Sequence, residues 1–392
     1  MIIYYFYLYP ETFFFKGKNK MLLYNAQTGK MLEVIQDSVM LQIQEELQNP
    51  DNLYCFQLNE WDFYKYKTFL DRLIAEGFGN LSGTSYQDRS VSYPPILKLN
   101  HGIDSIRADH RQGQDGYILD YLHEITIHLS GTPHVKEQFY YQQVIYPVKT
   151  DQRLENNRLL KWLQTTRGGA LKVVNILCSL QFIHEYWNLF NLLKELRVKI
   201  NYYIHYSDLY SCKITPEQLS LCNLVVIYEK EGLMQIQNIY DALCIVTATS
   251  DLALIENHLS DNKITIVPVY THANRSFFEK HVFTTKDELL TTKLSKKEIF
   301  TKMEINTNFF GKLTILPTGE IYSNLNAIPL GSINDSLYDI LFKELDSNMT
   351  WRKIRESQPC SDCRFKWLCP PISNYEFVLN ACNLCSIEEA ER

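Results

Sequence analysis

The chain ends in a dense group of cysteines, and this group constrains fold and function more than any other feature. Five of the ten cysteines lie in the last 33 residues, as Cys360-x2-Cys363-x5-Cys369 followed by Cys382-x2-Cys385. A Cys-x2-Cys pair lets two sulfurs from one tight turn reach one metal centre. Thiolates are soft ligands that suit zinc or iron–sulfur clusters. The spacing therefore predicts a metal site in this tail.

Composition and hydropathy favour metal binding over disulfides. The start, MIIYYFYLYP, is apolar but lacks the basic region and cleavage site of a signal peptide. No stretch of about 18 apolar residues predicts a membrane span. We therefore expect a cytoplasmic protein, in which thiols stay reduced and clustered cysteines bind metal. A net charge of −6 argues against a nucleic-acid partner.

Two metals fit the cysteine spacing. The two Cys-x2-Cys pairs, 18 residues apart, satisfy a four-cysteine zinc site. The first pair, Cys369 and one later cysteine satisfy a [4Fe-4S] cluster instead. Cys369 has no place in the zinc site, whereas the cluster requires it. Spacing alone leaves both metals open.

Upstream of the cysteines, the pattern divides the chain into three predicted units, residues 1–85, 86–300 and 301–392. The first has short aromatic strands and two helices, which predicts a winged-helix-like α+β module. Its first helix is capped by Asp37 or Ser38 and stopped at Asn49-Pro50, and its second ends at Gly77. A plain α+β packing domain is the alternative.

The middle unit alternates apolar strands with helical patterns. This alternation predicts an α/β fold with a parallel sheet, open or curved into a partial barrel. The predicted strands are residues 96–100, 125–129, 172–178, 199–206, 223–229, 243–250 and 263–270. The last unit begins with a predicted hairpin around Pro317-Thr-Gly319, followed by a helix within residues 330–345.

The motifs of the last unit support a more specific resemblance. Cys-x2-Cys-x5-Cys preceded by Ile-Leu-Pro-Thr-Gly-Glu-Ile-Tyr and Leu-Gly-Ser-Ile resembles the SPASM domain of radical SAM peptide-modifying enzymes. The ending LCPPISNYE…NLC more narrowly resembles the pseudo-radical-SAM/SPASM proteins of the GG-Bacteroidales peptide system. The first unit resembles the peptide-recognition modules of such systems. The resemblance implies a degenerate radical SAM partial (β/α) barrel with a SPASM-like cysteine domain.

The resemblance also implies a ligand set. In SPASM domains, Cys-x2-Cys-x5-Cys and a later cysteine bind the second of two auxiliary [4Fe-4S] clusters. The matching residues are Cys360, Cys363, Cys369 and Cys385, with Cys382 as the alternative fourth ligand. Zinc remains the alternative metal.

The other auxiliary cluster lacks its ligands in this sequence. Its cysteine positions correspond to Asn306 or Asn308, to Asn324 and to Ser373. All three positions have changed together, which is the pattern of a lost site. The resemblance therefore implies at most one cluster.

The residues needed for radical SAM catalysis are also missing. No Cys-x3-Cys-x2-Cys follows the strand at 96–100 or occurs elsewhere, and Ser130-Gly131-Thr132-Pro133 replaces Gly-Gly-Glu-Pro. We therefore expect neither S-adenosylmethionine nor catalytic residues. His101, Asp104 and His110 lie in the predicted loop at the barrel mouth and could bind a metal. A loop satisfied by hydrogen bonds and solvent is the favoured interpretation.

Together these features predict a non-catalytic partner in the maturation of ribosomally synthesised peptides. It would bind a precursor peptide, an active radical SAM maturase, or both, through the first unit or the barrel mouth. Two alternatives stay open. One is an iron–sulfur protein that relays electrons to a partner enzyme, and the other is a zinc-stabilised interaction protein.

Overall fold

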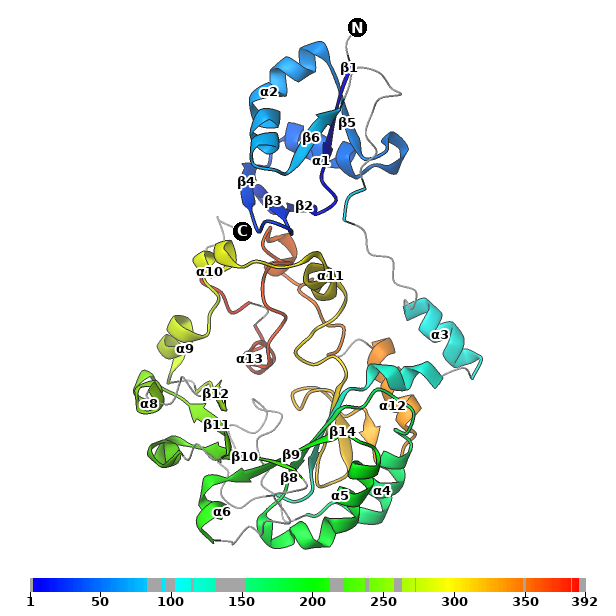
Figure 1. Ribbon diagram of the computed structural model, residues 1–392, viewed down its shortest axis with the longest axis vertical. Coiled ribbons are helices and arrows are strands. Elements are labelled where there is room, and N and C mark those ends of the chain that lie inside the picture. Colours follow the sequence, from blue (N-terminus) through cyan, green and yellow to red (C-terminus); the bar gives the residue numbers. More distant parts are fainter. Residues whose placement is uncertain are drawn as a thin grey trace.

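The computed structural model describes most of the chain in eleven segments. They are residues 3–82, 93–95, 103–113, 116–131, 152–211, 222–236, 240–256, 263–271, 273–347, 350–381 and 383–387. An N-terminal module lies at one end of the molecule and a large curved sheet at the other, with the C-terminal tail between them (Figure 1). None of the helices in these segments is long and apolar enough to cross a membrane.

The N-terminal module contains two small antiparallel sheets. In one, β1 (Ile3–Leu8) pairs with β5 (Cys55–Asn59) and β6 (Gly79–Ser82). In the other, β3 (Lys20–Asn25) lies between β2 (Thr12–Lys16) and β4 (Met31–Ile35). Helices α1 (Ser38–Gln48) and α2 (Glu60–Ala75) pack with these strands around one apolar core.

The first helix of this module begins and ends where the sequence predicts, and the second ends there too. The side chain of Asp37 accepts hydrogen bonds from Val39 N and Met40 N and so caps α1, which ends at Asn49. Gly77, just after α2, has φ +81°, a conformation that glycine adopts without steric cost. The two predicted helices are confirmed.

The large sheet has nine strands in the order β12-β11-β10-β9-β8-β7-β13-β14-β15. Neighbours from β12 to β13 run parallel, and β14 and β15 extend the sheet antiparallel. The bounds are β7 (Glu124–His128), β8 (Val173–Leu177), β9 (Lys199–His205), β10 (Asn223–Tyr228), β11 (Asp241–Val246), β12 (Ile264–Pro268), β13 (Lys312–Ile315), β14 (Glu320–Tyr322) and β15 (Gly331–Ser332). The predicted α/β fold with a mostly parallel sheet is confirmed, and β7 to β12 correspond to predicted strands.

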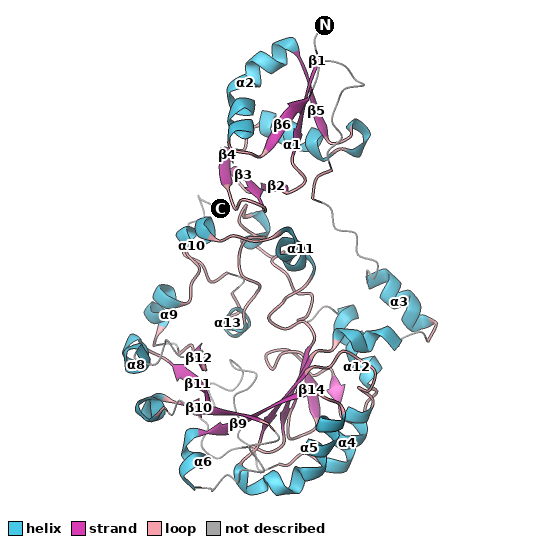
Figure 2. Cartoon of the chain, in the orientation of Figure 1, coloured by secondary structure: helices cyan, strands magenta, loops and turns pink. Residues whose placement is uncertain are grey.

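Helices and short 3-10 turns cover the large sheet and connect it to the tail. Figure 1 shows α4 and α5 on the convex side of the sheet. The helices that follow the N-terminal module, drawn in cyan in Figure 2, are α3 (Ile103–Arg111), α4 (Asn156–Gln164), α5 (Trp187–Glu195), α6 (Tyr206–Ser211), α8 (Thr249–Ile255), α9 (Arg275–His281), α10 (Lys286–Thr291), α11 (Lys296–Glu304), α12 (Leu337–Ser347) and α13 (Asn374–Val378). The 3-10 turns in this part of the chain are η3 (Gly116–Tyr121), η5 (Leu180–Tyr186), η6 (Lys230–Gln235) and η8 (Cys360–Asp362), whereas η1 (Pro50–Asn52) belongs to the N-terminal module.

A row of amide side chains crosses the opposite, concave face of the sheet. Asn175 Nδ2 donates to Glu124 Oε1 (2.6 Å) and Thr126 Oγ1 (3.2 Å), and Asn201 Nδ2 donates to Asn175 Oδ1 (2.9 Å). Asn223 Nδ2 continues the row to Asn201 Oδ1 at 3.4 Å. The row satisfies polar groups that would otherwise be costly to bury.

The predicted hairpin of the last unit is part of the large sheet. Gly319 turns the chain between β13 and β14 with φ +88°, as the sequence predicts. β13 runs parallel to β7, whose other edge pairs with β8. The strands of residues 301–392 and of residues 86–300 therefore share one sheet. The predicted strand at 96–100 lies outside the described residues.

The β2–β4 sheet packs on both faces, which joins the N-terminal module to the tail. One face contributes to the core with α1 and α2, and the other packs against α10, α11 and apolar residues of the tail. The fully buried guanidinium of Arg364 makes an ion pair with Glu33 of β4, with 2.6 Å between Nη2 and Oε1. The module and the tail therefore pack through a continuous interface.

Candidate metal centre

Four of the five tail cysteines line one small cavity. Cys360 and Cys363 flank the turn η8, where Cys363 N donates to Cys360 O (3.1 Å). Cys369 follows in the next turn, and Cys385 comes from the last described segment. The structure therefore brings together the four cysteines that the resemblance implies. Cys382, the alternative ligand, lies outside the described residues.

Backbone pairing with the strand-like segment before α10 positions Cys385. Thr284 N donates to Leu384 O (3.0 Å), and Ser386 N donates to Thr284 O (3.1 Å). These two bonds fix the backbone on both sides of Cys385. The cavity is thus closed by a segment that is distant in sequence from Cys360, which the Cys-x2-Cys spacing alone does not specify.

The thiols lie in a buried setting. Cys360 and Cys363 are 8% and 7% exposed, and Cys369 and Cys385 are partly buried. Burial raises the pKa of Cys360 and Cys363, and raises the pKa of Cys369 to about 12. These three thiols therefore favour their protonated form, so a bound metal would have to displace the protons.

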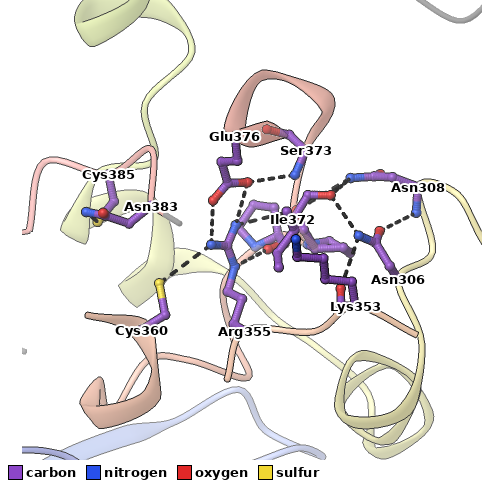
Figure 3. A network of polar contacts seen from close by, with 12 residues as sticks. Asn306, Asn308, Lys353, Arg355, Cys360, Ile372, Ser373, Glu376, Asn383 and Cys385 are labelled. Carbon is purple, nitrogen blue, oxygen red and sulfur yellow. Dashed lines mark hydrogen bonds and ion pairs between the residues drawn. The ribbon is translucent and has the colours of Figure 1, made fainter. Parts of the chain in front are cut away.

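A buried ion pair borders the cysteines (Figure 3). Arg355 Nη1 lies 3.7 Å from Cys360 Sγ and 2.7 Å from Glu376 Oε1, and Arg355 Nε donates to Pro370 O (2.8 Å). Burial alone lowers the pKa of the Arg355 guanidinium, but the charge of Glu376, its hydrogen bond and the nearby cysteine sulfurs together outweigh burial and leave that pKa raised. Arg355 is therefore a permanent cation that donates to a cysteine sulfur.

The donor set fits a soft metal group, although the cavity is small. It measures about 20 Å³, room for about one water molecule. In the described segments, no three His, Cys, Asp or Glu side chains are arranged to hold a single metal ion. Zinc needs four sulfurs at about 2.3 Å from one point. A four-iron cluster binds each thiolate at a different iron, so sulfurs around a shared space suit it better, provided that they move apart.

A second group of side chains lies across the ion pair from the cysteines. Asn306 Nδ2 and Asn308 Nδ2 both donate to Ile372 O, at 3.0 and 3.1 Å (Figure 3). Asn324 Nδ2 donates to Asn374 Oδ1 (3.0 Å), beside Ser373. We call Asn306, Asn308, Asn324, Asn326 and Asn374 the asparagine network. The positions that the resemblance marks as lost ligands thus lie around residues 372–374.

The prediction for the barrel mouth is wrong in one respect. Residues 103–111 form the helix α3 and not a loop, because Ile103 and Ile106 lie on one helical face and pack into the main core. His110 stacks on Phe342 of α12, with 3.6 Å between ring centroids. Asp104 is exposed and pairs with Arg107. Asp104 and His110 therefore face a neighbouring helix and solvent, and His101 lies outside the described residues.

At the end of β7, the first residue of the Ser-Gly-Thr-Pro segment makes a structural contact. Ser130 Oγ donates to Cys178 Sγ at 3.5 Å. Burial raises the pKa of the Cys178 thiol to about 12, so this sulfur is a neutral core group. Thr132 and Pro133 lie outside the described residues.

Sequence reasoning missed the Arg355–Glu376 pair. The two residues lie on opposite sides of the first three cysteines and 21 positions apart. Arg355 stands in the charged stretch Trp351-Arg-Lys-Ile-Arg-Glu, so nothing in its neighbourhood singles it out.

Comparisons with known proteins give two solved structures at low similarity. The chain is similar to Streptococcus suis SuiB bound to its precursor peptide SuiA, at 12% identity and a TM-score of 0.45, covering 99% of this chain and 100% of that one. It is also similar to anSMEcpe with bound AdoMet and a peptide, at 11% identity and a TM-score of 0.38, covering 63% and 88%. No family model and no curated protein matches the chain. At these scores the likenesses do not establish a function.

Proposed function

We propose that this protein is a non-catalytic partner in the maturation of ribosomally synthesised peptides, with one [4Fe-4S] cluster in its tail. The convergence of four cysteine thiols on one cavity carries the proposal. An arginine that donates to one sulfur supports it, because a cluster with four thiolates is an anion that a buried cation stabilises. Cys360, Cys363, Cys369 and Cys385 would bind the cluster.

The rest of the chain supports a partner without radical chemistry of its own. The sequence has no Cys-x3-Cys-x2-Cys to bind the catalytic cluster. At the end of β7, where radical SAM enzymes carry Gly-Gly-Glu-Pro, this chain has Ser130-Gly131-Thr132-Pro133. The Ser130 hydroxyl donates to the buried sulfur of Cys178. When bound, the tail cluster would supply a rigid crosslink or one-electron redox chemistry. The chain's own residues would bind a precursor peptide and present it to an active maturase.

Anaerobic purification followed by iron, sulfide and zinc analysis tests the cluster. We expect about four irons and four sulfides per chain, which follow from the cluster composition. Cys369→Ser should remove the iron, whereas a four-cysteine zinc site would survive this change. Zinc in place of iron would overturn the cluster assignment.

Capture assays test the partner function. The tagged, metal-loaded protein should retain a precursor peptide, an active radical SAM maturase, or both. A charge-matched scrambled peptide is the control for unspecific retention. Retention of neither specific partner would overturn the function while leaving the metal analysis intact.

An electron-relay function is the second candidate, and partial exposure favours it. Cys369 and Cys385 are partly buried while Cys360 and Cys363 are buried. A cluster held there would have one side close to the surface, where a partner could exchange electrons. A reduction potential too high to serve a radical SAM partner would eliminate this candidate.

A further inference from the structure

A large cavity lies between the N-terminal module and the tail. It measures about 710 Å³, within the range of ligand sites. One wall is β2 with the turn that follows it, and the end of α1 adjoins it. The opposite wall is residues 361–363, 366 and 367 of the tail, with Phe300 and Met303 of α11. Pro94 and Pro95 complete the lining, and we call this space the module–tail groove.

The charge of the module–tail groove is opposite to that of the protein. Among its described lining residues, three carry ammonium groups, Lys16, Lys18 and Lys366, and one carries a carboxylate, Asp362. The Asp362 carboxylate already accepts a hydrogen bond from Gln358 Nε2 at 2.6 Å. In a chain with net charge −6, this local positive potential attracts an anionic ligand.

The edge of β2 that lines the groove is only partly open to strand addition. β2 is an edge strand of its sheet, and edge strands can pair with a peptide. The centre of this edge is closed, because Gln44 Nε2 of α1 donates to Phe14 O at 3.0 Å. A bound chain must therefore be held mainly by charges and by the groove's apolar walls.

One polar atom in the groove lining needs a donor. Gln36 lines the groove, and its side-chain oxygen is buried with no hydrogen-bond partner among the described residues. Such an atom is costly unless a donor satisfies it. A backbone N–H of a peptide would be a suitable donor.

The groove continues into the cysteine site. Cys363 and Lys366 line both the module–tail groove and the four-cysteine cavity. A ligand in the groove would therefore contact a residue that also binds the metal group. Binding should be visible in the spectrum of that group.

We infer that the module–tail groove binds an extended acidic segment of a peptide. The inference rests on the proposed function, since it specifies the chemistry and position of the peptide to be bound. Lys16, Lys18 and Lys366 would face the carboxylates, and Trp367 and the proline pair would contact the backbone and apolar side chains. The ligand is thus distinguished by its charge and its extended form.

Fluorescence anisotropy with labelled decapeptides tests the inference on the full-length, metal-loaded protein. The probes are an alternating Glu-Leu peptide, its Lys-Leu counterpart, and a single-stranded oligonucleotide of equal negative charge. We expect the acidic peptide to bind most tightly, with an affinity that falls with salt. Lys16→Glu with Lys18→Glu should weaken it at least about tenfold, which is typical of reversing charges in a complementary site. Binding should also shift the cluster absorption.

The matched control is Lys65→Glu with Lys67→Glu, which reverses two charges on α2 of the same module outside the groove. It should leave acidic-peptide binding unchanged. Equal weakening by both pairs, tighter oligonucleotide binding, or no acidic-peptide binding would each overturn the inference. The inference and the proposed function can fail separately. A precursor peptide that binds wild type and the Lys16/Lys18 variant equally would contradict only the assignment of the groove as the peptide site. No capture of either specific partner would contradict the function itself.

Discussion

The cysteine cavity and the asparagine network lie on opposite sides of one buried ion pair, yet they are completed differently. In the asparagine network, amide groups donate to Ile372 O and to Asn374 Oδ1, so the polar groups satisfy one another. Asn306 and Asn324 are fully buried there. In the cysteine cavity, thiols are weak donors and acceptors that satisfy one another poorly. The asparagine network is therefore complete without a ligand, whereas the cysteine cavity is suited to bind a metal group.

The difference shows how amide side chains can hold one part of the tail together through hydrogen bonds alone. Asparagine has two donors and one strong acceptor, so it can bridge backbone carbonyls. Asn306 does this by donating to both Ile372 O and Lys353 O, at 3.0 and 3.3 Å. The tail therefore combines one site held by amides with one proposed to be held by metal.

Removing one residue from each site should give the largest contrast. Cys363→Ser should abolish iron binding, because a cluster needs all four thiolates and serine is a poor ligand for it. Asn324→Ser should leave the iron content unchanged. Iron and sulfide analysis of both proteins after anaerobic purification measures this. Equal iron in the two variants would contradict the assignment of the cysteines.

Breaking the ion pair between the two sites should have the next largest effect. Arg355→Met leaves Glu376 buried without its partner, and such losses cost about 3–5 kcal/mol of unfolding free energy. Arg355 and Glu376 side chains are 11% and 2% exposed, so solvent screens the pair little. Urea unfolding of wild type and variant measures the difference.

The double variant Arg355→Met with Glu376→Met is the control for the ion pair. It removes both charges and should recover part of the lost stability, because no charge is then left buried alone. A double variant no more stable than Arg355→Met would mean that packing, rather than charge, explains the loss.

Shortening one asparagine should have a smaller effect. Asn306→Ala removes two donated hydrogen bonds and leaves buried carbonyls with fewer donors, which costs about 1–3 kcal/mol. Asn19→Ala, at the exposed turn between β2 and β3, is the comparison. Thermal unfolding should separate the two variants, and metal content should be unaffected in both. A loss of iron in Asn306→Ala would show that the two sites depend on each other.

The local rules of sequence predicted much of this fold. Asp37 and Gly77 mark helix ends because capping and positive φ depend on neighbouring residues alone. Apolar strands predicted the parallel sheet for the same reason. The helix at 103–111 was missed because its buried face is short, with Ile103 and Ile106 spaced three apart in a polar sequence.

Long-range partners account for what the sequence could not predict. The Cys-x2-Cys motif indicates a metal site, but Thr284 positions Cys385 through backbone bonds that no side-chain pattern encodes. Arg364 and Glu33 are 331 positions apart, and nothing in either neighbourhood signals their pairing. Likewise, the module–tail groove exists only because β2 packs beside the tail.

The smallest expected effect concerns Glu344, a buried carboxyl near the asparagine network. Burial raises its pKa, although it accepts hydrogen bonds from Trp351 N, Ser323 Oγ and Thr350 N. The folded state therefore binds this proton more tightly than the unfolded state does. The stability that the proton contributes is present below the unfolded pKa and is lost as the pH rises through the folded pKa.

Glu344→Gln keeps the oxygen that accepts from Trp351 N and Thr350 N, places an amide donor beside Ser323 Oγ, and removes the titration. Its unfolding free energy relative to wild type should therefore rise with pH. Urea titrations of wild type and Glu344→Gln across the pH range measure the difference. A difference that stays flat would mean that the Glu344 carboxyl has an ordinary pKa in the folded protein.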